Sequence, residues 1–338
     1  MRTDQFVFVH STDWHLQPVN PPSRLGSYAQ DIIDKIKRVG EIAKEYEADF
    51  TTCGGDVWNK KDPKGTTHEV LHDAAGAVMA SGLPCYCVPG NHDLRFDRDD
   101  TLPEQPLGVF FKTGVMVRQV AQVLRKDKIS VRLRGIPFAE SPDFGALMLT
   151  AEEEAMADCH VLSLHIYASP SGGSLHGTKV HSYATLAKLG YDVVLLGHYH
   201  ADQGVTVLPG PRGDCTIVNI GSLSRGDYGD ENLDRVPKCC VVTISKDGVE
   251  TEEVPVGAKP ASEVFDLRKK VELKEHEQET EAFVTELSRV TLAKEDEGEQ
   301  VALEEEVADL GLSDAAVIAS VKEYIDKAVE MLQQGKAS

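Results

Sequence analysis

The sequence has no apolar run long enough to cross a membrane. Its best runs, such as Val193 to Leu196, have the length of a strand, whereas a spanning helix needs about 20 apolar residues. The N-terminus leads directly into a strand-like segment, without the apolar core or the small-residue cleavage site of a secretory signal. We therefore expect a cytoplasmic protein that does not act at a membrane.

The sequence also lacks paired cysteines. Its seven cysteines are scattered, and none of them forms a C-x-x-C pair. Cys85 and Cys87 alternate within an apolar, strand-like segment. This placement favours small buried thiols over a disulfide or a metal site, in agreement with a reducing compartment.

Positive charge is scarce. The chain has 35 Lys and Arg residues against 55 Asp and Glu residues, a formal net charge of −20. This composition argues against wrapping of nucleic acid by a broad basic surface, although metal cations or a local basic groove would still permit a nuclease. The acidity is uneven, because 20 acidic and 10 basic residues follow residue 257. We expect a catalytic domain over residues 1–257 and a small acidic helical segment over residues 258–338.

Strand and helix patterns alternate along the first part of the chain. Strands are expected at 5–11, 49–53 and 84–88, with helices at about 29–47 and 66–81 between them. This β-α-β-α-β order predicts an α/β fold with parallel strands. Further strands are expected at 130–135, 160–165, 193–197, 215–220, 239–245 and 249–256.

Two amphipathic helices are expected in the C-terminal segment, at 277–292 and 314–334. The second carries an apolar stripe along one face, between a plausible N-cap at Ser313 and an end at Gly335. Packing on the protein's own body and docking on a partner are both open explanations of this stripe.

Five short polar motifs each follow an apolar, strand-like run. They are Asp13-Trp14-His15, Gly55-Asp56, Gly90-Asn91-His92-Asp93, His165 and Gly197-His198-Tyr199-His200. Functional groups gather outside the carboxyl ends of strands in open α/β sheets, so we expect the motifs to converge at one sheet edge. Each motif alone is a weak signal, since G-D is a common turn and a lone histidine is usually structural. Their joint occurrence in this order favours one site.

The residue types in these motifs suit a pair of metal ions. Two adjacent ions can neutralise phosphoryl oxygens and lower the pKa of a bound water, as hydrolysis of a phosphate ester requires. Asp13 and His15 can share one metal, and the carboxylate of Asp56 can bridge both. We expect His92 to stabilise the transition state or protonate the leaving group, with Asp93 orienting its ring. Further oxygen and nitrogen ligands are expected from Asn91, His165, His198 and His200.

The motif set resembles the calcineurin-like metallophosphoesterase superfamily over roughly residues 5–257. The resemblance implies a four-layer αββα sandwich and a dinuclear metal site with no ligand position missing. One metal would be bound by Asp13, His15, Asp56 and His200, and the other by Asp56, Asn91, His165 and His198. Mn²⁺ is the expected metal, and Fe²⁺ and Zn²⁺ also accept this mixed nitrogen and oxygen set.

Two segments resemble the SbcD-like nuclease subunit of DNA double-strand-break repair complexes, including phage and bacterial relatives. They are Asp13-Trp14-His15-Leu16 and Gly221-Ser222-Leu223-Ser224-Arg225. The resemblance implies an exo- or endonuclease whose C-terminal region docks on the coiled coil of an SMC-like ATPase. Arg225 is a candidate substrate contact. Asn59 departs from the pattern, because many members of that branch have His or Asp there.

Two other functions stay open. A phosphodiesterase or phosphatase for small nucleotides or phosphoproteins is favoured by the acidic composition and by Asn59. A scaffold protein with a structural metal site is suggested by the C-terminal helices. The sequence leaves the polarity of digestion and the oligomeric state, including a homodimer, undecided.

Overall fold

The computed structural model describes residues 3–22, 24–60, 65–175, 177–226 and 230–268. The chain divides into two units, Met1–Asp266 and Leu267–Ser338. This division lies C-terminal to the expected boundary at 257, because the short helix α8 (Ala261–Val264) and the buried ring of Phe265 belong to the first unit. The helices expected at 277–292 and 314–334 lie outside the described residues.

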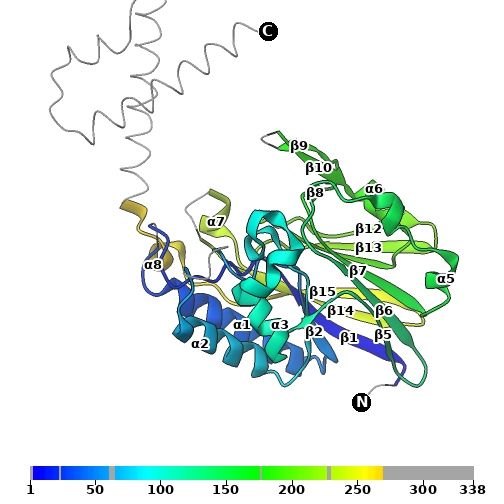
Figure 1. Ribbon diagram of the computed structural model, residues 1–338, viewed down its shortest axis with the longest axis horizontal. Coiled ribbons are helices and arrows are strands. Elements are labelled where there is room, and N and C mark those ends of the chain that lie inside the picture. The colour runs from blue at the N-terminus through cyan, green and yellow to red at the C-terminus, as the bar shows by residue number, and fades with distance from the viewer. Residues whose placement is uncertain (1–2, 23, 61–64, 176, 227–229, 269–338) are drawn as a thin grey trace, which may run out of the picture. The chain divides into compact units, whose positions relative to one another are not determined.

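Two six-stranded sheets form the centre of the first unit (Figure 1). The first has the order β15-β14-β1-β2-β3-β4, and the second has the order β12-β13-β11-β7-β6-β5. The first sheet consists of β1 (Gln5–Ser11), β2 (Phe50–Cys53), β3 (Cys85–Cys87), β4 (Val117–Arg118), β14 (Lys238–Ser245) and β15 (Gly248–Pro255). The second consists of β5 (Ala121–Arg125), β6 (Ser130–Ile136), β7 (Cys159–His165), β11 (Val193–Gly197), β12 (Gly204–Gly210) and β13 (Gly213–Asn219).

The central strands of both sheets run parallel. β1, β2, β3 and β4 pair in parallel in the first sheet, as do β6, β7, β11 and β13 in the second. The antiparallel strands are β14 and β15 on one side of the first sheet and β5 and β12 at the edges of the second. Parallel neighbours end at the same side of a sheet, so the segments after β1, β2 and β3 are brought together.

Apolar side chains from the two sheets pack against each other. Phe8 of β1 stacks on Phe50 of β2 with ring centroids 4.9 Å apart, and both belong to one core cluster with Val161 and Leu195 of the second sheet. Alternate residues of a strand point to opposite faces, so the other face of each sheet is free to bind helices.

Helices cover the outer faces of both sheets. α1 (Tyr28–Glu45), α2 (His68–Met79) and α3 (Pro106–Thr113) contribute to the core on the first sheet. α4 (Phe144–Leu147) and α6 (Tyr183–Ala187) contribute to the core on the second. The predicted four-layer αββα sandwich is therefore confirmed.

The remaining elements are short. They are α5 (Ala151–Glu154), α7 (Asp230–Asp234), the small sheet β8 (Ala168–Ser169), β9 (Gly173–Leu175) and β10 (Thr178–Ser182), and the 3₁₀ turns η2 (Asn91–Asp93), η3 (Arg95–Asp97) and η4 (Asp99–Glu104). None of the described helices combines the length and apolarity that a membrane span requires.

Candidate metal centre

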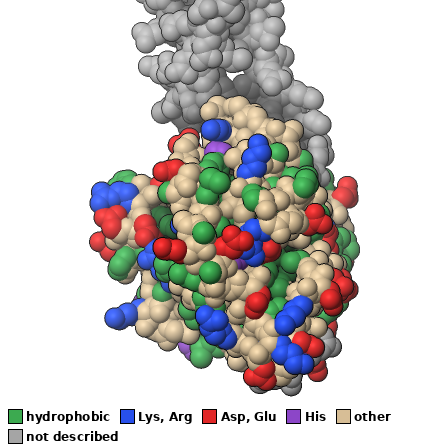
Figure 2. All heavy atoms as spheres, turned by 90° about the vertical axis from the view of Figure 1, so that its right-hand side faces the viewer, with side chains coloured by type: hydrophobic (Ala, Val, Ile, Leu, Met, Phe, Trp, Pro, Cys, Tyr) green, Lys and Arg blue, Asp and Glu red, His purple; other side chains and the backbone are tan. Residues whose placement is uncertain are grey.

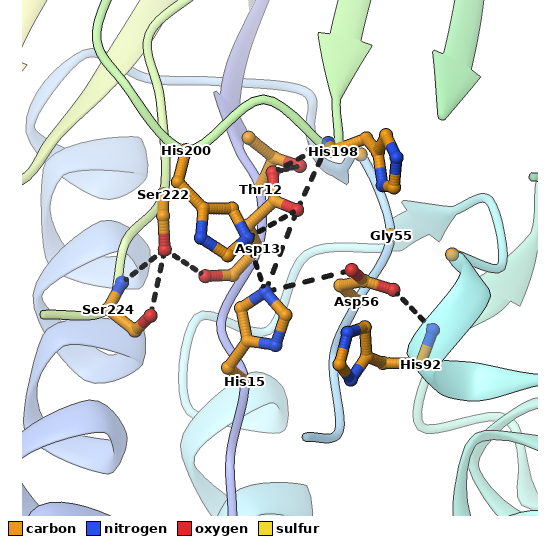
Figure 3. Close-up of polar contacts among 12 residues, drawn as sticks. Thr12, Asp13, His15, Gly55, Asp56, His92, His198, His200, Ser222 and Ser224 are labelled. Atoms are coloured by element: carbon orange, nitrogen blue, oxygen red, sulfur yellow. Dashed lines mark hydrogen bonds and ion pairs between the residues drawn. The ribbon is translucent and has the colours of Figure 1, made fainter. Parts of the chain in front are cut away.

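Polar motifs from both sheets meet where their strands end. Asp13, Asp56 and Asn91 follow β1, β2 and β3, whereas His165 ends β7 and His198 follows β11. In Figure 3 the side chains of Asp13, His15, Asp56 and His200 face one another. The expected convergence of motifs that are far apart in the sequence is present in the structure.

The first group of metal-donor atoms comes from Asp13, His15, Asp56 and His200, and these atoms lie within 4.8 Å of one another. The Nε2 atoms of His15 and His200 are 2.8 Å apart. His15 Nε2 is 3.6 Å from the Asp56 carboxylate, and His200 Nε2 is 3.8 Å from the Asp13 carboxylate. Two imidazole nitrogens and two carboxylates aimed at one point form a donor set that fits a divalent metal ion.

A second group of donors adjoins the first and shares Asp56 with it. It contains Asp56, His165 and His198. His165 Nε2 lies 3.3 Å from the Asp56 carboxylate and 3.3 Å from Asn91 Oδ1, which adds an amide oxygen to the group. The family grouping expected from the sequence matches these two groups, with Asp56 common to both.

Four of these donors are held in an uncommon backbone conformation. The φ angles of Asp13, His15, Asp56 and His198 are 53°, 48°, 50° and 90°. Left-handed backbone is disfavoured for residues with a Cβ, and such strain clusters at functional sites. The fold therefore sustains a local cost in order to aim these side chains.

Glycines beside the donors permit close approach. A Cβ added at Gly90 would lie 2.1 Å from Asp56 Oδ1 and 2.4 Å from the Asp56 backbone nitrogen. Gly55 has a φ of +105°, and a Cβ there would lie 2.5 Å from His165 Nδ1. Side chains at these two positions would displace the donors.

Burial and charge shift the protonation of the donors. Burial lowers the pKa of His15 and of His198 to about 3, and burial raises the pKa of Asp13. Burial also acts to raise the pKa of Asp56, but His165 and the other histidines outweigh it and hold that pKa well below its usual range. In His165, burial is outweighed by the Asp56 carboxylate, which raises the pKa to about 10. Metal binding at Asp56 therefore competes with protonation of His165.

Neighbouring polar groups fix the Asp13 loop. Thr12 Oγ1 donates to the Asp13 carboxylate at 2.7 Å, and the backbone N–H of His198 donates to the same carboxylate at 3.1 Å. Ser222 Oγ donates to the backbone carbonyl of Asp13 at 2.6 Å. Ser222 belongs to the G-S-L-S-R segment noted in the sequence, but its contact with Asp13 depends on the fold.

The ring of His92 is oriented by a backbone carbonyl. His92 Nδ1 lies 2.9 Å from the carbonyl oxygen of Asn59, and since a carbonyl only accepts, Nδ1 carries the proton. Nε2 is then the atom of His92 available to a substrate. The backbone N–H of His92 donates to Asp56 Oδ1 at 2.8 Å, which ties the histidine to the shared ligand.

The structure corrects the role expected for Asp93. Its carboxylate is buried and accepts from the backbone nitrogens of Val57, Trp58 and Gly90 at 3.2, 3.1 and 3.0 Å. Burial and the nearby Asp56 raise the pKa of Asp93 to about 7. Asp93 thus clamps the loop after β2 to the loop after β3, and the orienting contact to the His92 ring comes from Asn59.

The expectation that Arg225 contacts substrate is also corrected. Arg225 is only 3% exposed. Its guanidinium donates to the carbonyls of Arg235 and Lys259 at 3.2 and 2.9 Å and lies over the Phe265 ring at 5.5 Å. Burial lowers its pKa. Arg225 therefore holds α8 and the preceding loop in place, and its donors are directed at the backbone.

A cavity of about 520 Å³ opens beside the first donor group. His15, His92 and His200 form part of its wall. The rest of the wall includes the amide side chains of Gln17, Asn20, Asn59 and Asn232 and the rings of Pro21 and Pro22. Asn59 was noted in the sequence only as a departure from the SbcD-like pattern. The other amides were not identified from the sequence, because they lie outside the five motifs and reach the cavity only through the fold.

Comparison with known proteins agrees with this geometry. The sequence model of the calcineurin-like phosphoesterase family matches residues 6–202, more than half of the 338-residue chain. The chain belongs to the calcineurin-like phosphoesterase family. Membership implies a metal-dependent hydrolase of phosphoesters, and together with the two donor groups it indicates a dinuclear divalent metal site.

Individual relatives are more distant. The DNA double-strand break repair protein Mre11 of Archaeoglobus fulgidus is 31% identical over 88 residues, which cover 25% of this chain and 19% of that protein. The match thus spans about a fifth of the length of the curated relative. Among solved structures, a Staphylococcus aureus protein assigned as a 5′-nucleotidase has a TM-score of 0.51 at 14% identity, over 75% of this chain and 55% of that one. This second similarity concerns the fold alone.

Proposed function

We propose that this calcineurin-like phosphoesterase is a phosphodiesterase that cleaves DNA, as a nuclease of the SbcD-like repair type. The observation that carries the proposal is the pair of donor groups sharing Asp56, with His92 directly beside them. The partial similarity to an archaeal Mre11 protein supports DNA as the substrate.

Each candidate ligand has a proposed place. Asp13, His15 and His200 would hold one metal, Asn91, His165 and His198 the other, and Asp56 would bridge both. Mn²⁺ is the proposed metal, since carboxylate, amide and imidazole donors together suit it. When bound, the pair would neutralise charge on the phosphoryl oxygens and activate water at neutral pH.

His92 would act on the substrate directly. Nδ1–H is held by the Asn59 carbonyl. When the ring carries a second proton, on Nε2, that N–H can donate to a phosphoryl oxygen or deliver its proton to the leaving oxygen. Its ring lies in a T-shaped contact with that of His15, at a centroid distance of 4.9 Å. The catalytic imidazole is therefore held against the metal ligands in one orientation.

A second candidate function is hydrolysis of small nucleotides. The cavity of about 520 Å³ falls within the range of about 300–1,000 Å³ that is typical of small-molecule sites. Figure 2 shows a face on which Lys and Arg side chains are interspersed with Asp and Glu and form no continuous basic surface. The volume of the cavity favours a compact substrate over a long duplex.

Location and partners are proposed from the sequence. All seven cysteines are free and buried, which supports the reducing cytoplasm. Docking on an SMC-like ATPase would use the C-terminal helices, which lie outside the described residues. A homodimer likewise is a proposal from the resemblance.

The proposal can be tested by following hydrolysis of bis(4-nitrophenyl) phosphate, its mono-ester, and linear single- and double-stranded DNA, with Mn²⁺ and with EDTA. We expect Mn²⁺-dependent cleavage of the diester and of DNA. His92→Ala should lower kcat by about 10²–10⁴-fold, with both metals still bound. His72→Ala, a change at an exposed histidine of α2, is the matched control.

Two results would change the assignment. Hydrolysis of the mono-ester or the small diester with DNA intact would favour the small-nucleotide function. Absence of hydrolysis of every substrate, with metals bound, would contradict catalysis and favour a structural metal site.

A further inference from the structure

Two amide side chains in the cavity wall are joined to each other. Asn59 Nδ2 donates to Gln17 Oε1, and both residues line the cavity together with His15 and His92. Gln17 is only 7% exposed, so its amide is held by the surrounding protein. We call these two hydrogen-bonded side chains the Gln17–Asn59 pair.

The backbone fixes the register of this pair. The backbone N–H groups of His15 and Leu16 donate to the carbonyl oxygens of Asp56 and Val57, each at 2.9 Å. In return, the backbone N–H of Asn59 donates to the carbonyl oxygen of Leu16 at 3.0 Å. The segments after β1 and β2 therefore run side by side beyond the sheet. The same loops carry the metal ligands, so the pair has a fixed position relative to them.

The Gln17–Asn59 pair leaves one donor and one acceptor unused. Gln17 Nε2 and Asn59 Oδ1 have no hydrogen-bond partner among the described residues, whereas Asn20, in the same wall, uses its amide on Gly26 and Tyr28. If the oxygen and nitrogen are exchanged in both amides, the pair still has one NH₂ group and one carbonyl oxygen without a partner. The pair therefore offers one donor and one acceptor, whichever way the two amides are assigned.

This complement matches the Watson–Crick edge of a nucleobase. Each of the four DNA bases has a donor beside an acceptor on that edge. A neutral amide pair would form hydrogen bonds to this shared feature without strong preference among the four bases. It would require the edge to be free, so the nucleotide must be unpaired.

We infer that the Gln17–Asn59 pair binds the base of an unpaired nucleotide next to the scissile phosphate, and so determines the preference for nucleoside-containing over plain phosphodiesters. The inference rests on the proposed phosphodiesterase function and names the substrate group that the cavity takes. Asn59 then has two roles. Its carbonyl positions His92, and its side chain contacts the substrate.

The test compares two chromogenic diesters with Mn²⁺, thymidine 5′-(4-nitrophenyl phosphate) and bis(4-nitrophenyl) phosphate. They share the leaving group, and only the first carries a base. The measured quantity is the ratio of kcat/KM for the thymidine diester to kcat/KM for the plain diester. Gln17→Ala should lower this ratio about tenfold, because the Gln17 donor to the base is lost and Asn59 loses the side chain that holds its amide.

Gln30→Ala is the matched control, since it removes an amide from an exposed position of α1, and its ratio should equal that of the wild type. Gln17→Met, which keeps the length without polar atoms, repeats the test if Gln17→Ala does not fold. An unchanged ratio in a folded Gln17 variant that still hydrolyses the plain diester would overturn the inference and leave the proposed function standing. Failure of the wild type on both diesters would instead overturn the proposed function.

A DNA comparison tests the requirement for an unpaired base. The wild type should cleave a single-stranded oligonucleotide faster than the same strand in a blunt duplex, and Gln17→Ala should reduce this preference. Equal rates on both forms in the wild type would contradict recognition through the Watson–Crick edge.

Discussion

Single residues at the metal centre are constrained more by space and backbone than by hydrophobic burial. Asp13, His15 and Asp56 have left-handed φ angles near 50°, and each is stabilised by contacts across loops. The backbone N–H of Asp13 donates to the Gly55 carbonyl at 3.0 Å, and that of His15 to the Asp56 carbonyl at 2.9 Å. Small changes at neighbouring positions should therefore have large effects on ligand geometry.

Gly90→Ala should disrupt the centre. The added Cβ would lie 2.1 Å from Asp56 Oδ1 and 2.4 Å from the Asp56 backbone nitrogen, so Asp56 must move. We expect a loss of about 1–3 kcal/mol in the free energy of unfolding, together with weaker metal binding. Urea unfolding and calorimetric titration with Mn²⁺ measure the two effects.

Gly76→Ala is the control for this substitution. Gly76 lies within α2, and a Cβ there would meet no atom within 4 Å. Alanine should therefore stabilise the helix by about 0.5–1 kcal/mol and leave metal affinity unchanged. Equal metal affinity in the Gly90 variant and the wild type would contradict the prediction that displacement of Asp56 weakens metal binding.

At the scale of elements, α1 was expected at about 29–47 and spans Tyr28–Glu45. Its buried residues include Ile32, Ile36 and Val39, which recur at helical spacing on the face that meets the sheet. The spacing gave no indication that Lys35 is also buried, at 7% exposure. Its ammonium lies 3.8 Å from the Asp31 carboxylate one turn earlier.

Lys35→Met should stabilise the protein in a pH-dependent manner. Burial lowers the pKa of Lys35 from 10.5 to about 7. The Asp31 carboxylate acts to raise this pKa, and the charge of Arg24 lowers it further. The Lys35 ammonium therefore loses its proton more readily in the folded state than in the unfolded state. Folding is penalised below pH 7, and the penalty disappears as the pH rises from 7 toward 10.5. We expect a gain of about 1–2 kcal/mol at pH 6 and a smaller gain at pH 10.

Thermal unfolding at both pH values measures this difference. Lys37→Met on the same helix, at a side chain that is 49% exposed, should change stability by less than about 0.5 kcal/mol at either pH. A gain for Lys35→Met that is larger at pH 10 than at pH 6 would refute the assigned cause.

On the scale of the whole molecule, the metal centre joins the two sheets. Asp13, His15 and Asp56 follow strands of the first sheet, whereas His198 and His200 follow β11 of the second. A ligand that binds only the assembled centre stabilises the entire folded unit. Metal binding should therefore be visible in global unfolding, beyond its effect on activity.

Mn²⁺ should raise the melting temperature, and EDTA should reverse the rise. At a free metal concentration of 100 times Kd, the expected stabilisation is about 2.7 kcal/mol. His200→Ala removes one donor from the first group and should reduce the shift, whereas His72→Ala should retain it. Differential scanning calorimetry measures both. A melting temperature that is independent of Mn²⁺, Fe²⁺ and Zn²⁺ would contradict the dinuclear site.

The sequence by itself determined the alternation of strands and helices and the residue types of the site. Strand and helix periods are local properties, so the order β-α-β-α-β and the positions of the five motifs could be read directly. The convergence of those motifs also followed, because parallel strands place their carboxyl ends at one side of a sheet. The resemblance then supplied the four layers and the expected grouping of ligands around Asp56.

Only the tertiary structure decided which groups support the site. Asp93 clamps two loops, Asn59 orients His92 through its carbonyl, and Arg225 is buried against backbone carbonyls. The link between Gln17 and Asn59 likewise joins residues 42 positions apart. Such contacts depend on how loops after different strands pack, and a chain's local pattern of apolar and polar residues carries no information about that packing.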